Sequence, residues 1–92
     1  MIVSFRDVET SKLFTKRKSR RFANIAKVAL RKLDQLEAAK SLEDLRIPPA
    51  NRLELLKGDR QGQYGIRINN QCRVCFEWRH DGAHEVEIVD YH

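Results

Sequence analysis

The 92-residue chain lacks any long hydrophobic run, whereas a membrane-spanning helix needs about 20 consecutive apolar residues. Its opening residues, MIVSFRDVET, lack the basic and then apolar pattern of a secretory signal. The chain also lacks internal repeats, low-complexity segments and a linker that would divide it. These absences predict one small cytoplasmic domain, residues 1–92, with no membrane contact.

Cysteine is scarce, and the only two, Cys72 and Cys75, are spaced as CxxC. A tetrahedral zinc site would need a second pair of ligands, which the sequence does not offer at metal spacing. Residues three apart on a strand also point to opposite faces of a sheet. We therefore predict small apolar residues in a reducing compartment, with no metal and no cofactor.

Acidic residues are outnumbered: 13 Asp and Glu stand against 18 Lys and Arg, which gives a net charge of +5 and a pI near 9.6. This balance favours polyanionic partners, with nucleic acid first and an acidic protein or anionic membrane behind it. A charge that serves only solubility is the alternative. The densest positive segment, KRKSRR, is expected to contact RNA phosphates or to form a solvated basic face, and it contains Lys16, Arg17, Lys18, Arg20 and Arg21.

Helical signals occupy the first half of the chain, after a short β-prone segment at residues 2–5. Asp7 is placed to cap a short helix that runs to about Phe14 or Thr15. Ser19 is placed to cap a longer helix ending near Ala39, and its apolar stripe steps by three and four residues: Phe22, Ile25, Ala29, Leu33 and Leu36. A capping pair, Ser41 and Asp44, predicts one further turn, after which Pro48 and Pro49 exclude regular structure.

The periodicity changes to two from Gln61 onward. Three alternating segments, separated by NNQ and HDG, predict three strands in an antiparallel meander. Helices that come first and strands that come last define an α+β fold, with the helices packed on one face of the sheet.

The register of these strands places two arginines directly opposite each other. A three-residue loop at 69–71 keeps the apolar rows on one face and sets Arg67 opposite Arg73 on the other. Since like charges destabilise such pairs, a phosphate clamp is one explanation. The alternative is that each arginine pairs with a nearby glutamate, such as Glu77, Glu85 or Glu87, or extends into water.

A second three-residue loop, His80-Asp81-Gly82, is expected to pair Phe76 with Val86 and Val74 with Ile88. Tyr91 then falls on the same face as the two arginines.

The stretch LKGDRQGQYGIRINNQCRVCFEW and the terminal VEIVDYH resemble the HigB toxins of the RelE superfamily, which belong to bacterial type II toxin–antitoxin modules. The resemblance covers the whole chain. It implies a RelE-like microbial RNase fold with a short N-terminal strand, two helices and a C-terminal antiparallel sheet. It also implies ribosome-dependent cleavage of mRNA, and a helix-turn-helix antitoxin (HigA/Xre-like) through which the toxin reaches operator DNA only indirectly.

The matching positions give the candidate active site. Asp90, Tyr91 and His92 match the terminal motif, and Lys57, Arg67 and Arg73 match the basic positions. Three positions depart from the family pattern: Glu54 where some members have histidine, Cys72 where tryptophan is usual, and Gly65 where serine is common.

The chemistry expected from these residues is metal-free cleavage by the ribose 2′-hydroxyl. Glu54, or else Lys57, would be the base and His92 the acid, while the arginines would hold the phosphate. Tyr91 would stack on a base, and Asp90 would orient His92 or Tyr91. A non-catalytic RNA- or ribosome-binding inhibitor is the second hypothesis. A DNA-binding regulator is disfavoured because the basic helix lacks a helix-turn-helix partner.

Overall fold

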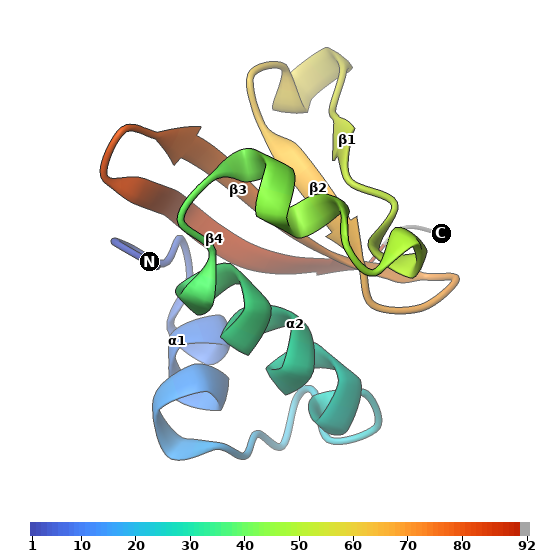
Figure 1. Ribbon diagram of the computed structural model, residues 1–92. Helices are drawn as coiled ribbons and strands as arrows, with labels where there is room; N and C mark the ends of the chain where they lie inside the picture. The colour runs from blue at the N-terminus through green and yellow to red at the C-terminus, as the bar shows by residue number, and fades with distance from the viewer. Residues whose placement is uncertain (91–92) are drawn as a thin grey trace.

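The computed structural model describes residues 1–90 and confirms the α+β class (Figure 1). The helices are α1 (Val8–Lys16) and α2 (Ala26–Ala38), and three short 3-10 helices follow: η1 (Leu42–Arg46), η2 (Pro49–Asn51) and η3 (Gly58–Arg60). The strands are β1 (Glu54–Leu55), β2 (Tyr64–Arg67), β3 (Cys72–Arg79) and β4 (Gly82–Asp90).

Helix α1 begins where its capping residue predicts. The Asp7 side chain accepts a hydrogen bond from the Thr10 backbone N–H at 3.1 Å, which satisfies one of the donors left unpaired at a helix start. The helix ends at Lys16, and the left-handed backbone of the next residue, Arg17, lets its N–H donate to the Leu13 carbonyl at 2.9 Å.

The predicted start of the longer helix at Ser19 is wrong, because α2 begins at Ala26. Ser19 does accept a hydrogen bond from the Phe22 N–H at 3.1 Å, but this bond closes only an isolated turn. The bond from the Ile25 N–H to the Phe22 carbonyl, at 3.0 Å, likewise spans three residues rather than four. Cations are unfavourable at the positive end of a helix dipole, so the basic run 16–21 is a poor first turn.

The turn after α2 follows the prediction for Ser41 and Asp44, which form a capping box at the start of η1. The Asp44 carboxylate accepts hydrogen bonds from the backbone N–H groups of Lys40 and Ser41 at 2.9 and 3.2 Å, and these bonds lower its pKa. The expectation that the prolines exclude regular structure is wrong, because one short 3-10 helix, η2, begins at Pro49. Pro49 opens the single-turn helix η2, because the first position of a helix needs no N–H donor.

The sheet has four antiparallel strands in the order β1-β2-β3-β4, one more than predicted. The additional strand, β1, has only two residues, Glu54 and Leu55, which is too short to show a periodicity. The predicted register of the first hairpin is confirmed, since Arg67 lies opposite Arg73 and Ile66 opposite Val74.

The second hairpin corrects the predicted loop. Val74 pairs with Ile88 as expected, but Glu77 pairs with His84 and Arg79 with Gly82, so the connection has two residues rather than three. A bulge between Cys75 and Glu77 accommodates this one-residue shift in the pairing of β3 with β4. The predicted pair of Phe76 with Val86 is absent from the register of the described residues. Glu85, with φ of 54°, takes the left-handed conformation that accommodates the extra residue.

Gly82 opens β4 with φ of 129°, and its position admits no side chain. A Cβ atom there would lie 2.2 Å from the Met1 carbonyl oxygen, because the N-terminal segment runs along this strand. Gly82 thus has a positive φ that favours glycine, although it lies in the strand rather than in the predicted loop.

Two faces of the sheet differ in what covers them (Figure 1). The core face packs against α1 and α2, and its largest fully buried side chain is Phe76. Other buried members of this cluster come from both layers: Leu13, Ala29, Leu33, Leu36, Ile66, Val74 and Val86. The outer face carries Gly65, Arg67, Arg73 and Cys75, which alternate with the core positions.

The N-terminal segment protects the edge of β4. The predicted strand 2–5 forms two isolated parallel bridges, Ile2 with Ala83 and Phe5 with Val86, rather than a continuous ladder. Thr10 in α1 extends this protection, because its hydroxyl accepts a hydrogen bond from the Ile88 N–H at 3.1 Å.

Candidate active site

A row of directly paired residues crosses the outer face from one edge of the sheet to the other. Glu54 pairs with Gly65, Gly65 with Cys75, and Cys75 with Glu87, so the four residues share one face. Two carboxylates therefore stand at the ends of the row, and two small residues lie between them. The small residues leave room for longer side chains to cross the sheet.

A shallow open groove of about 540 Å³ lies on this face, beside β1 and η3. It brings together three of the predicted site residues, Glu54, Lys57 and Arg73. Sequence reasoning gave no role to the other residues that line it: Leu56, Asp59, Arg60 and Asn70. Arg60 had a signal, since it ends the GDR motif, residues 58–60, within the stretch that resembles the HigB toxins. Asn70 lies in the loop that sets the arginine register.

The candidate base and the candidate phosphate clamp contact each other inside the groove. The Arg73 guanidinium donates to the Glu54 carboxylate, with the two side chains 27% and 51% exposed. The predicted alternative, neutralisation by a glutamate, is confirmed for Arg73, but the partner is Glu54. Two of the glutamates named for this role pair with other arginines, Glu77 with Arg79 and Glu87 with Arg60, each at 2.6 Å. An incoming phosphate would compete with Glu54 for the Arg73 guanidinium.

Arg67 shares the outer face with Arg73 but engages other partners. Its Nε donates to the Asn69 carbonyl at 3.2 Å, and its Nη2 donates to the Asn70 side chain. The loop thus holds Arg67 while β1 holds Arg73. The two arginines therefore lie opposite each other in the sheet but have different partners, and only Arg73 lines the groove.

Lys57 is exposed and immediately precedes η3, for which it is the capping residue. Its side chain lines the groove with Glu54 and Arg73. The groove therefore combines a carboxylate with several cations, an arrangement that can bind a phosphate and accept a proton.

Asp90, the last residue of β4, is not among the residues that line the groove. Asp90 pairs with Cys72, which places it on the core-face side, and it lines a separate pocket with Arg21, Asn69 and Gln71. Burial raises the pKa of Cys72, and the charge of Asp90 raises it further. The predicted roles of Tyr91 and His92 lie outside the described residues.

The basic run divides into separate environments. Arg17 forms a two-pronged ion pair with Asp34, at 2.9 and 2.6 Å, and Arg21 stacks over Phe22 at 5.4 Å from the ring centre. The remaining predicted contacts, Lys16, Lys18 and Arg20, line a surface depression with Lys12. This part of the molecule offers a basic surface away from the groove.

Cysteine and histidine positions do not assemble a metal site within residues 1–90, since no three His, Cys, Asp or Glu side chains cluster there. Across the same residues, none of the helices has the length and apolar character needed to cross a bilayer.

Comparison with known proteins identifies the class. A family model for HigB-like toxins, described as the RelE-like toxin of type II toxin-antitoxin system HigB, matches residues 3–92. The chain is therefore a RelE-like toxin of a type II toxin–antitoxin system, and such a toxin has an antitoxin as its partner. Within that class, the chain belongs to the HigB-like toxin family.

One named relative agrees with this assignment. Toxin HigB-1 of Vibrio cholerae serotype O1 is 39% identical over 80 residues, which are 85% of this chain and 84% of that protein. An uncharacterized protein of Haemophilus influenzae is 42% identical over 66 residues, which are 72% of this chain and 65% of that protein. A solved structure, the YoeB/ParE toxin from Agrobacterium tumefaciens, aligns over 99% of this chain and 96% of its own, with a TM-score of 0.49 and 21% identity. Values this low add nothing to the assignment.

Proposed function

We propose that this toxin is a ribosome-dependent endoribonuclease that cuts mRNA and thereby stops translation in the cytoplasm. The observation that carries the proposal is the groove, where Glu54, Lys57 and Arg73 meet although they come from β1, the segment before η3, and β3. Membership of the HigB-like family supports the same reading. The partner that silences the toxin would be a helix-turn-helix antitoxin, through which alone the toxin would reach operator DNA.

The proposed reaction is transphosphorylation by the ribose 2′-oxygen. Glu54 takes the 2′-hydroxyl proton, the 2′-oxygen bonds to phosphorus, and the bond to the 5′-oxygen breaks. His92 gives its proton to the departing 5′-oxygen. Arg67, Arg73 and Lys57 stabilise the negative charge that grows on the phosphoryl oxygens.

The last three residues of the chain, 90–92, supply the remaining groups in this proposal. Tyr91 stacks on a nucleobase next to the cut, since unpaired RNA is commonly read by stacking on aromatic rings. Asp90 orients Tyr91 or His92. The basic surface around Lys16, Lys18 and Arg20 contacts phosphates of ribosomal RNA, a contribution that salt weakens.

Expression without an antitoxin tests the function. The expected result is growth arrest together with mRNA cut within codons, mapped by sequencing of RNA 5′ ends. His92→Ala should abolish the cuts while the purified protein keeps its circular dichroism spectrum. Arrest with intact mRNA would exclude cleavage as the cause.

One observation favours a second candidate, a non-catalytic inhibitor that occupies the ribosome. The ion pair between Glu54 and Arg73 holds the candidate base against a cation that the reaction needs. An occupancy inhibitor would stay toxic after loss of Glu54 and His92, but not after combined loss of Arg67 and Arg73. A toxin that acts by cleaving mRNA would instead lose its toxicity when Glu54 and His92 are removed.

A further inference from the structure

The GDR motif has no part in the chemistry above, yet its arginine lines the groove. Residues 56–63 fold into a closed turn held by backbone bonds. The Leu56 N–H donates to the Gln63 carbonyl at 2.8 Å, the Gln63 N–H to the Arg60 carbonyl at 2.9 Å, and the Arg60 N–H to the Lys57 carbonyl at 3.4 Å. These bonds shape the turn but do not attach it to β3 or β4.

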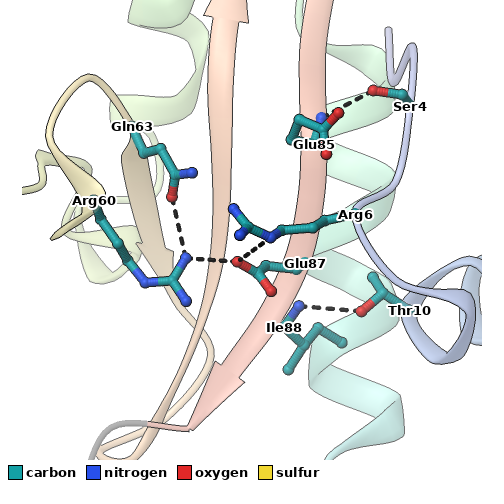
Figure 2. A network of polar contacts seen from close by, with 8 residues as sticks. All are labelled: Ser4, Arg6, Thr10, Arg60, Gln63, Glu85, Glu87 and Ile88. Carbon is teal, nitrogen blue, oxygen red and sulfur yellow. Dashed lines mark hydrogen bonds and ion pairs between the residues drawn. The ribbon is translucent and has the colours of Figure 1, made fainter.

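The side chain of Arg60 attaches this turn to the far side of the sheet (Figure 2). Its Nη1 donates to the Gln63 side chain at 3.1 Å and to the Glu87 carboxylate in β4 at 2.6 Å. The Arg60 and Glu87 side chains are 28% and 16% exposed, so water screens this pair less than it screens an exposed ion pair. One guanidinium thus joins η3 to β4 across the outer face.

Glu87 also has a second cationic neighbour, which provides a control. The Arg6 Nε lies 3.8 Å from the same carboxylate oxygen, and its side chain is 56% exposed. Figure 2 shows Arg6 approaching Glu87 from the N-terminal segment, on the side away from Arg60 and Gln63. Arg60 lines the groove, whereas Arg6 lines a different depression, with Phe5 and Val8.

We infer that Arg60 and Glu87 form a latch that positions Lys57 for the scissile phosphate. Lys57 directly precedes η3, and its carbonyl accepts the Arg60 N–H, so movement of Arg60 moves Lys57. Arg60 is therefore a positioning residue, and the inference rests on the proposed function. A lysine ammonium helps a reacting phosphate only if it is held in place, because small displacements reduce the rate steeply.

A double-mutant cycle on mRNA cleavage by ribosome-bound toxin tests the latch. Arg60→Met should slow cleavage about tenfold, within the coupling found between residues that share a network. In a Lys57→Ala background the same substitution should change the rate less than about twofold, because the residue that it positions is gone. Arg6→Met, the matched control, should leave the rate of the otherwise unaltered toxin within about twofold. Equal losses from Arg60→Met in the two backgrounds would overturn the inference.

Amide hydrogen exchange provides a readout that needs no cleavage. Residues 57–63 should exchange faster in Arg60→Met and in Glu87→Gln than in the wild type, while Arg6→Met should leave them unchanged. Unchanged exchange in all three variants would refute the latch. If the wild-type protein failed to cut mRNA, the proposed function would fall, and the exchange result would still decide whether the latch exists.

Discussion

The two faces of the sheet show a division between stability and chemistry. The core face buries Ile66, Val74 and Phe76 under two helices, and its contacts are apolar. The outer face holds arginines and glutamates in ion pairs that remain partly exposed. Apolar burial contributes far more to folding than exposed ion pairs do, so substitutions on the two faces should have separable effects.

The largest expected effect tests the core face. Phe76→Ala removes a fully buried ring that stacks on Tyr64 with 6.2 Å between ring centres, so it should cost about 3–5 kcal/mol of unfolding free energy. Val89→Ala, opposite Arg73 on the outer face, should cost about 1 kcal/mol or less. Urea unfolding measures both, and equal losses would show that the division between the faces is wrong.

The next effect tests the outer face. Arg73→Met should reduce mRNA cleavage about a hundredfold, as loss of a charge-stabilising donor does elsewhere. Its unfolding free energy should change by about 1 kcal/mol or less, because the pair with Glu54 is partly exposed.

Arg79→Met is the matched control for this substitution, since it removes an exposed arginine that pairs with Glu77 on the same strand and lies outside the groove lining. It should retain cleavage. A parallel loss of stability and activity in Arg73→Met would mean that the outer face also supports the fold.

A buried cation in the helical layer sharpens the comparison. Lys32 in α2 donates to the Asn51 side chain at 2.6 Å, and Asn51 donates to Gln35 at 2.9 Å and to the Leu45 carbonyl at 3.1 Å. This network joins η2, which precedes β1 in the chain, to helix α2. Lys32→Met leaves the buried Asn51 oxygen without this donor and should cost about 1–3 kcal/mol. A neutral result in urea unfolding would show that η2 is held by apolar contacts.

The same lysine predicts a pH dependence. Burial lowers the pKa of Lys32 below its ordinary 10.5, and repulsion from Arg31 lowers it further. Between the folded pKa and 10.5 the unfolded chain binds more protons at this site, so the wild type should gain stability relative to Lys32→Met as pH rises. Urea midpoints of both proteins between pH 8 and about 10.5 measure the difference. A wild type that loses stability relative to the variant over this interval would contradict the sign.

The smallest effect tests competition inside the groove. Glu54→Gln removes the carboxylate that holds Arg73, and an ion pair this exposed is worth about 0.2–1 kcal/mol, so affinity for inorganic phosphate should rise by at most about fivefold. Glu77→Gln, which releases Arg79 outside the groove, should leave phosphate affinity unchanged. Calorimetric titration distinguishes these outcomes, and weaker binding by Glu54→Gln would mean that Glu54 supports the anion site.

Local signals predicted the elements whose bonds are local. The Asp7 cap and the Ser41–Asp44 capping box depend on residues three apart, and both occur as predicted. The first hairpin register followed from alternation alone, because a slip of one residue would have exposed Ile66 and Val74. The start of α2 and the bulge near Cys75 were missed, since neighbouring charge and strand pairing override the local pattern there.

The sequence by itself determined the fold class, the basic character and the opposition of Arg67 to Arg73, because periodicity, composition and parity are properties of the chain order. Only the tertiary structure decided that Glu54 pairs with Arg73 and that Arg60 reaches Glu87, 27 residues away. Such contacts depend on how β1 and η3 lie across the sheet, and no local spacing encodes that arrangement.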